Sequence, residues 1–298
     1  MKKILFAGLA IAAMAALSVS CQKNELLASE GRRPVSFEAS IASAPGTKFS
    51  MTDEGIYVKA SWEVGDEIAV LWYAGTNAVT TETYEKFTVT KVSADGKSAT
   101  FSKESSAFPT SGTVTAMFVY PFKAYNSGYK GYWLSTATLS ADSVKDPAAN
   151  AVNYAKADVT DGSFPVLTFT QQNSFLFIKQ GTKIPGVTEG DHSLEIGGVK
   201  YMGVAHKGTG DNLDIISAYT GINVGINSGE HILFSKVGDN VVLGQDVWIP
   251  LFPYGATSLQ IKVTKTTGST TEYGPSEWEK TPAVGKVYDL SNSFTPTP

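Results

Sequence analysis

An alternation of apolar and polar residues with a period of two constrains this chain more than any other feature. Residues 35–41, "VSFEASI", carry an apolar side chain at every second position, and residues 258–264, "SLQIKVT", repeat the pattern. This period predicts strands with one buried face. Asp95-Gly96 lies between two such runs and predicts a hairpin. Past the first 20 residues no window has a helical period, and a short helical turn is expected only within residues 140–157.

The fold expected from these runs is all-β, with short strands separated by Gly and Asn turns. Residues 67–72, "EIAVLW", are apolar on both faces and predict a central strand. The chain is too long for one small sandwich and suits two. The turn-rich segment 158–166 places the boundary near residue 160. We therefore expect an N-terminal β-sandwich over residues 34–160 and a C-terminal β-sandwich over residues 161–298.

Residues 1–20 are expected to form a lipoprotein signal peptide that ends just before Cys21, the single cysteine of the chain. A positive "MKK" precedes an uncharged apolar run, and small residues lead to Cys21. This end of the signal resembles the lipobox of bacterial lipoproteins, which implies cleavage after residue 20 and acylation of Cys21, with palmitate among the acyl chains. A plain signal peptide with an incidental Cys is the alternative. Residues 21–33 then read as a lipidated tether, whose extended reach is about 40 Å.

The net charge, the positions of the histidines and the lack of known motifs exclude several classes of function. A net charge of −4 argues against a nucleic-acid partner. The three histidines, His192, His206 and His231, are scattered and are expected at the surface or in turns. Residues 207–214, "KGTGDNLD", are interpreted as a turn, because they lack the ordered ligand spacing of a calcium loop. We find no catalytic constellation and expect no enzyme activity, no metal and no cofactor.

Three sequence features have both a structural and a functional interpretation. In "SWEVGDEIAVLW", Gly65-Asp66 is expected to turn the chain into a buried strand, and Trp62 and Trp72 are expected in the core rather than at a ligand. Asp142-Ser143-Val144 resembles an O-glycosylation acceptor, with Ser143 as the modified residue. A cluster of aromatic residues among Gly, Asn and Lys either covers one end of a sandwich or contacts glycans. Its members are Tyr125, Tyr129, Tyr132 and Trp133.

Several motifs, in order along the chain, resemble those of fimbrillin-like lipoproteins of Bacteroidales. They are "VSFEASI", "SWEVGDEIAVLW", "AMFVYPF", "VLTFTQQNSFLFIKQ" and "VGKVYDLSNSF". Residues 22–25, "QKNE", resemble the signals that send such lipoproteins to the outer face of the outer membrane. The resemblance implies two transthyretin-like Greek-key β-sandwiches in tandem. It also implies a surface lipoprotein that serves as a fimbrial (pilus) structural or adhesive subunit, with other fimbrial subunits as partners through β-strand addition.

The resemblance implies a processing site, and here the chain departs from the family. A protease is expected to cut in the loop behind the first strand, where this chain has Lys48 in place of Arg. The two arginines of the chain, Arg32 and Arg33, precede that strand, and a cut after Arg32 would remove the tether alone. Both Lys48 and Arg32 could instead lie in ordinary solvated linkers. The candidate donor strand is the closing segment, with Val287, Tyr288, Leu290 and Phe294.

A rival interpretation uses the same anchor and fold class. A glycan-binding outer-membrane lipoprotein of a polysaccharide-uptake system would also be all-β and lipid-anchored. The aromatic cluster around Tyr132 and Trp133 would then contact host or bacterial surface glycans.

Overall fold

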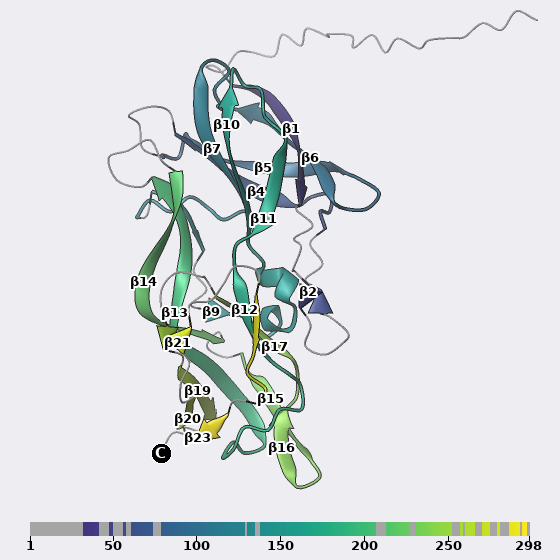
Figure 1. The fold of residues 1–298 in the computed structure, drawn as a ribbon, viewed down its shortest axis with the longest axis vertical. Coiled ribbons are helices and arrows are strands. Elements are labelled where there is room, and N and C mark those ends of the chain that lie inside the picture. The colour runs from purple at the N-terminus through teal and green to yellow at the C-terminus, as the bar shows by residue number, and fades with distance from the viewer. Residues whose placement is uncertain are drawn as a thin grey trace, which may run out of the picture.

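The computed structural model describes residues 32–41, 48–49, 56–57, 61–73, 79–128, 130–134, 138–206, 213–226, 230–251, 257–258, 260–265, 270–274, 279–280, 286–292 and 294–296. These residues form an all-β protein, as predicted (Figure 1). The helical elements in these ranges are two short 3-10 helices within the segment expected to hold a helical turn, η1 (Ser143–Lys145) and η2 (Pro147–Asn150).

The strands, in chain order, are β1 (Arg33–Ile41), β2 (Lys48–Phe49), β3 (Ile56–Tyr57), β4 (Glu67–Tyr73), β5 (Tyr84–Val92), β6 (Ser98–Ser106), β7 (Thr113–Tyr120), β8 (Gly131–Leu134), β9 (Thr138–Leu139), β10 (Asn153–Thr160), β11 (Leu167–Gln171), β12 (Ser174–Ile178), β13 (Gly190–His206), β14 (Leu213–Ile226), β15 (Ile232–Val237), β16 (Asn240–Leu243), β17 (Val247–Leu251), β18 (Thr257–Ser258), β19 (Gln260–Lys265), β20 (Thr270–Gly274), β21 (Glu279–Lys280), β22 (Val287–Asp289) and β23 (Thr295–Pro296).

Seven strands close into one sheet in the order β1-β11-β10-β7-β4-β5-β6, which occupies the upper half of Figure 1. Its pairs are antiparallel except for β1 and β11, which run parallel. β11 lies beyond residue 160, where the sequence suggested a boundary. The sheet that begins with β1 therefore includes a strand from the segment expected to open the second domain.

The interior of the closed sheet is filled by the alternating apolar residues that the sequence shows. On β1, Val35, Phe37, Ala39 and Ile41 are buried, whereas Ser36 and Glu38 are exposed. Large aromatic side chains dominate this core. They are Phe37, Trp62, Trp72, Phe87, Phe101, Phe108, Phe118 and Phe169. Since each aromatic ring buries a large apolar area, this core contributes strongly to the stability of the closed sheet.

β4 is buried on both faces, as its unbroken apolar run predicted. Ile68, Val70 and Trp72 face the core of the closed sheet. Ala69, Leu71 and Tyr73 belong to a second cluster on the outer side, together with Met117, Val119, Tyr132 and Val152. The segment that follows β7 therefore covers the outside of β4, which explains why this strand has no polar face.

The remaining strands form further sheets, most of which lie below the closed sheet in Figure 1, while the ribbon of β13 and β14 reaches up toward it. One sheet has the strand order β17-β12-β22. A larger sheet has the strand order β16-β15-β13-β19-β20-β23, and it also includes β14 and β8, which pair with β13, and β9, which pairs with β14. β8 pairs with β13 and β9 pairs with β14, although both short strands lie between β7 and β10 in the chain. Leu139 and Val144, which lie between β7 and β10 in the chain, are buried in the core that these further sheets share, called the lower core below.

Two predicted turns rest on glycine. Gly96, in the Asp95-Gly96 hairpin between β5 and β6, has a φ of +71°, and a Cβ there would lie 2.9 Å from Ser61 Cβ. Gly65, in the turn before β4, has a φ of +97°. Both φ values lie in the left-handed region, where glycine avoids the strain that other residues incur. These hairpin and turn predictions are confirmed.

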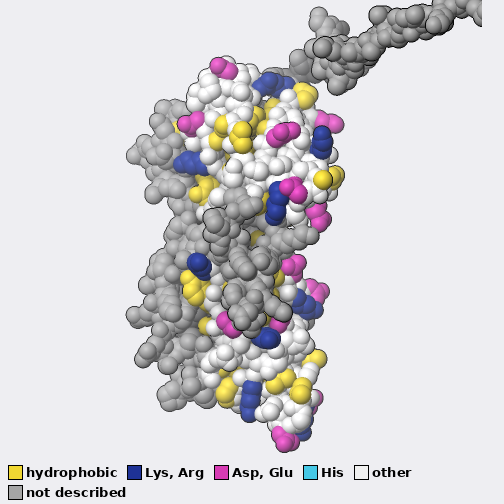
Figure 2. All heavy atoms as spheres, turned by 45° about the vertical axis from the view of Figure 1, so that its right-hand side comes forward, with side chains coloured by type: hydrophobic (Ala, Val, Ile, Leu, Met, Phe, Trp, Pro, Cys, Tyr) yellow, Lys and Arg dark blue, Asp and Glu magenta, His cyan; other side chains and the backbone are white. Residues whose placement is uncertain are grey.

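Acidic and basic side chains are interspersed on the face drawn in Figure 2. Among the described residues no helix is long and apolar enough to cross a membrane. The same residues contain no group of three or more His, Cys, Asp or Glu side chains that could hold a metal ion.

Candidate functional site

β1 is the structural feature on which the candidate site is built. On one side it pairs antiparallel with β6, with partners that run from Arg33↔Ser106 to Ser40↔Ser98. On the other side it pairs with β11 over three positions, from Ala39↔Leu167 to Ile41↔Phe169. The strand is therefore held firmly along one edge and briefly along the other.

Phe37 fixes β1 in the core. Its ring lies 5.5 Å from Phe87, 5.4 Å from Phe101, 5.2 Å from Phe118 and 4.6 Å from Phe164, measured between ring centroids. Aromatic pairs at such distances each add stabilisation beyond the area that they bury. Removal of this one side chain would leave four rings without a common neighbour.

The junction between the tether and β1 is held by an ion pair. Arg32 Nη1 lies 3.5 Å from Glu85 Oε1, and the two side chains are 43% and 5% exposed. Glu85 also accepts hydrogen bonds from Ser106 Oγ at 2.6 Å and from the Ala107 N–H at 2.9 Å. The buried carboxylate therefore has donors from three residues, and Arg32 is engaged before β1 begins.

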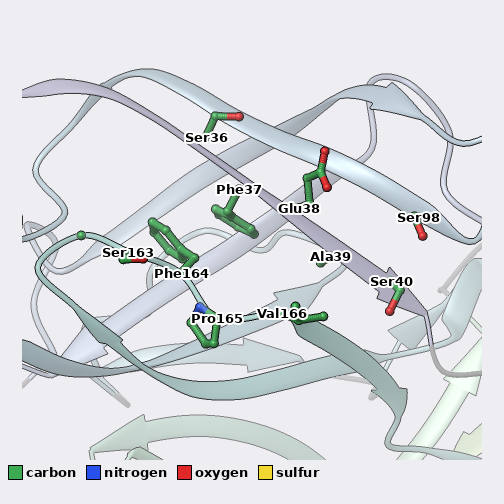
Figure 3. A pocket seen from close by; sticks show the side chains of 11 residues that line it. Ser36, Phe37, Glu38, Ala39, Ser40, Ser98, Ser163, Phe164, Pro165 and Val166 are labelled. Carbon is green, nitrogen blue, oxygen red and sulfur yellow. The ribbon is translucent and has the colours of Figure 1, made fainter.

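A groove runs along the outside of β1 beside residues 162–166 (Figure 3). Its volume is about 610 Å³. One wall is formed by Ser36, Glu38 and Ser40 of β1 with Ser98 of β6, and the other by residues 162–166. Val166 in this second wall is 92% exposed, which is unusual for a large apolar side chain.

The Trp-Gly-Asp signature is structural, as expected. Trp62 is buried with its ring 4.9 Å from Phe101 and 5.3 Å from Tyr120. Asp66 Oδ2 accepts the Glu63 N–H at 2.8 Å, and Asp66 Oδ1 accepts the Tyr120 hydroxyl at 3.4 Å. Burial raises the pKa of Asp66 above its ordinary value, and burial beside Asp66 raises the pKa of Tyr120 to about 12. The signature shapes the turn into β4.

The predicted processing and lipidation sites are only partly described. Cys21 lies outside the described residues. Lys48 lies in β2, which pairs with β3 at Lys48↔Tyr57, and its side chain lies outside the description. Arg32 has the ion pair with Glu85 given above. A protease that reads the Arg32 side chain would have to break this pair first.

The candidate donor strand is part of its own fold. Val287 begins β22, which runs parallel to β12 with Tyr288 opposite Leu176. Leu290 is buried in the lower core, and Tyr288 and Phe294 pack against that core. This segment would have to leave its own sheet before it could enter another subunit.

The aromatic cluster turns mainly inward. Tyr132 is 0% exposed and belongs to the cluster over β4, so it offers no ring face to a sugar and is a core residue. The Tyr125 hydroxyl donates to the Val79 carbonyl at 3.2 Å, and its ring lies 5.5 Å from Tyr84. Trp133 is half-buried in β8, and Tyr129 lies outside the described residues. The covering interpretation fits Tyr125 and Tyr132.

Ser143 is engaged in a local network. Its Oγ donates to the Ser140 carbonyl at 3.0 Å and accepts the Ser140 N–H at 3.0 Å, and Val144 beside it is fully buried. A sugar on Ser143 would therefore have to replace the bond that its hydroxyl donates.

One expectation about the histidines is wrong. His192 is buried on β13, where its ring lies 5.0 Å from Phe234 and its Nδ1 lies 3.0 Å from the Gly190 carbonyl oxygen. The flat ring packs on a sheet face, and its polar atom contacts the backbone. This residue can therefore be buried although it is polar. Of the segment 207–214 that was predicted to be a turn, Leu213 and Asp214 lie in β14. Residues 207–212 lie outside the part of the chain that the structure describes.

No family model and no curated protein sequence matches this chain. The solved structures that resemble it include a candidate cell adhesion protein from Bacteroides ovatus, with a TM-score of 0.46 and 15% identity, covering 90% of this chain and 96% of that one. A candidate cell adhesion protein from Bacteroides uniformis has a TM-score of 0.45 and 15% identity, with 88% and 93% covered. The fimbrial anchor protein Mfa2 from Porphyromonas gingivalis has a TM-score of 0.38 and 12% identity, with 80% of each chain covered. These structural neighbours are adhesion and fimbrial proteins of Bacteroidales, the kind of protein that the sequence motifs resemble.

Proposed function

We propose that this chain is a non-catalytic structural or adhesive subunit of a fimbria, held at the outer face of the outer membrane by lipid on Cys21. The observation that carries the proposal is the position of β1. It follows directly on the tether, it completes a closed sheet, and its central residue Phe37 contacts four aromatic rings. On this proposal the two halves of the chain are transthyretin-like sandwiches, the first extended to include β11.

Strand addition follows from what the loss of β1 would leave behind. β6 would present an unpaired edge over nine residues, from Ser98 to Ser106, beside the exposed rings of Phe101 and Phe164. An open apolar edge is a template for another strand, and folded proteins normally cover such edges. A strand from a neighbouring subunit would restore both the hydrogen bonds and the core.

The shape of the vacated place sets requirements for the donor. It needs apolar residues at alternate positions and a large ring at the position of Phe37. In an extended closing segment, alternate side chains face the same side, so Asn292 would face the core together with Tyr288, Leu290 and Phe294. Burial of this amide in an apolar core would weaken binding of the donor strand. Withdrawal of Leu290 would also open the lower core. These features favour a donor from a related subunit over a second copy of this chain.

The cut that removes β1 is proposed after Lys48. A cut there releases residues 35–41 together with the lipid, whereas a cut after Arg32 removes the tether and leaves β1 in place. The ion pair to Glu85 supports slow cleavage at Arg32. Pro34 after Arg33 also disfavours cleavage at Arg33.

Limited digestion tests the proposal. Mature protein is treated separately with a lysine-specific and an arginine-specific protease, and then sized together with a peptide or subunit that supplies a donor strand. We expect stable complexes or oligomer ladders only after the lysine cut, with mass spectrometry locating that cut after Lys48. A Lys48→Gln variant is the matched control and should stay monomeric. Monomers after both treatments, with residues 35–41 still bound, would overturn the proposal.

A further inference from the structure

The uncut β1 has backbone groups that point into the groove. The Ile41 N–H donates to the Lys97 carbonyl of β6 at 2.9 Å, and the β1–β6 register is unbroken from Val35 to Ser40. Because backbone groups alternate in direction along a strand, the even-numbered residues direct theirs away from β6. β11 takes up this edge only from Ala39 onward. Among the described residues, the N–H and C=O of Ser36 and the N–H of Glu38 therefore have no strand partner.

The walls of the groove suit an extended segment. Residues 163–166 run beside β1 in Figure 3, and Phe164 stacks on Phe37 with an interplanar angle of 19°, which closes the floor. Val166 stands at the rim almost fully exposed. A volume of about 610 Å³ is within the range of sites that bind ligands of drug or short-peptide size. Free backbone groups beside an apolar rim are the features that β-strand addition uses.

The charge of the groove favours one kind of strand. Glu38 is the charged residue among those that line it, and it forms no ion pair with any residue that the structure describes. Its exposed carboxylate would attract a Lys or Arg on an incoming strand and repel an acidic one.

We propose that the uncut protein accepts a short strand at this free edge of β1. The occupant is an extended segment of a neighbouring fimbrial subunit that carries a basic residue opposite Glu38 and an apolar residue against Val166. The identity of the partner rests on the proposed function, whereas the strand chemistry rests on the groove alone. This contact would join a second subunit to the chain while β1 and its tether remain in place.

Nuclear magnetic resonance titration of residues 22–298 with acetylated, amidated pentapeptides tests the inference. The probe is Val-Thr-Lys-Val-Thr, and the matched peptides are Val-Thr-Glu-Val-Thr and the lysine peptide with N-methylated backbone amides. We expect the lysine peptide to shift the Ser36 and Glu38 amide signals, the N-methylated peptide to bind at least about tenfold more weakly, and the glutamate peptide to bind more weakly as well. In Glu38→Lys the preference between the two charged peptides should reverse.

Two valine variants separate docking from unfolding. Val166→Asp should weaken the lysine peptide at least about tenfold, whereas Val64→Asp, at a site 69% exposed outside the groove, should leave binding unchanged. Three results would overturn the inference. They are no shift at about 5 mM peptide, where a complex with a Kd of about 1 mM is mostly formed, equal binding of the N-methylated peptide, and binding of a polysaccharide but not of peptides that is lost in Val166→Asp. Each can occur whether or not the lysine cut yields oligomers, so the two proposals fail separately.

Discussion

Arg32 and Glu85 join the start of β1 to β5 through an ion pair whose two members differ greatly in exposure. The carboxylate of Glu85 is buried and takes part in two further hydrogen bonds, whereas Arg32 is partly exposed to water. The two partners should therefore contribute unequally to stability, since a solvated cation gains little from its pairing.

Glu85→Ala is expected to lower the free energy of unfolding by about 1–3 kcal/mol, because the Ser106 hydroxyl and the Ala107 N–H lose their acceptor. Arg32→Ala should lower it by less than about 1 kcal/mol, because Glu85 keeps those two donors. Urea unfolding of both variants measures the difference. A larger loss in Arg32→Ala than in Glu85→Ala would contradict this description.

Phe37→Ala is expected to lower the free energy of unfolding by about 3–5 kcal/mol, the usual effect of removing a buried ring. Its neighbour Glu38 is exposed, so Glu38→Ala should change stability by less than about 0.5 kcal/mol. Chemical denaturation of the two variants side by side checks the contrast. A loss below about 1 kcal/mol in Phe37→Ala would mean that β1 is not an integral part of the core.

Two buried tyrosines should respond differently to loss of the hydroxyl. The Tyr132 hydroxyl is buried without a hydrogen-bond partner among the described residues, and burial raises the pKa of Tyr132 well above its ordinary value. Tyr132→Phe should therefore be neutral or slightly stabilising. The Tyr84 hydroxyl donates to the Lys123 carbonyl at 2.6 Å, so Tyr84→Phe should cost about 1–2 kcal/mol. Thermal unfolding of the two variants measures this difference. Equal losses of stability in Tyr132→Phe and Tyr84→Phe would contradict the different hydrogen bonding of the two hydroxyl groups.

Asp66 should make stability depend on pH. Burial raises its pKa in the folded state above 3.8, although the Glu63 N–H and the Tyr120 hydroxyl oppose the change. Between the unfolded and the folded pKa the folded state binds more protons, so this group's contribution to stability falls as pH rises through that window. Asp66→Asn keeps an acceptor for the Glu63 N–H and cannot ionise. The free energy of unfolding of Asp66→Asn, measured by urea denaturation relative to the natural protein, should rise from pH 4 to pH 7. A fall over this range would mean that the pKa of Asp66 is lowered in the folded state.

Cys21→Ala tests the anchor. If the cysteine is acylated, cell fractionation should find the variant in soluble fractions and the natural protein in membranes, because the acyl chains provide the membrane affinity. A Ser20→Ala variant, which keeps the cysteine, serves as a control and should remain in membranes. Full membrane retention of Cys21→Ala would argue against lipidation.

The strands were predictable where the local pattern is strong. Residues 35–41 alternate and form the core-facing part of β1, and residues 67–72 are apolar on both faces and form most of β4. Both patterns reflect burial, because the order of apolar and polar residues along a strand shows which of its faces are buried. The longest strands, β13 and β14, were missed. Glycines interrupt them, and two irregularities near Val199 break their pairing, so the periodic pattern is weak.

The partners of the strands were not predictable from local patterns. The parallel pairing of Ala39 with Leu167 joins residues far apart in the chain, and β8 leaves the neighbourhood of β7 to pair with β13. Such contacts depend on how side chains fit across the whole fold. For the same reason the Gly, Asn and Lys around Tyr132 left open whether its ring covers a sandwich or contacts glycans, and only the structure shows that the ring is buried over β4.

The groove beside β1 was also invisible in the sequence. Val166 lies in a stretch that suggested a polar boundary, and its exposure becomes meaningful only because residues 162–166 run beside an unpaired strand edge. An exposed valine next to a proline gives no local signal of a binding surface.

Electron microscopy of cells that carry or lack this protein tests the central claim most directly. In the parent strain an antibody to this chain should label surface fibres. In the deletion strain, where fibres are scored by their shape without the antibody, they should be lost or detached from the cells, and return of the natural chain should restore them. Complementation with the Cys21→Ala variant should yield fibres that are shed from the cell. Fibres of unchanged number and attachment in the deletion strain would contradict a fimbrial role.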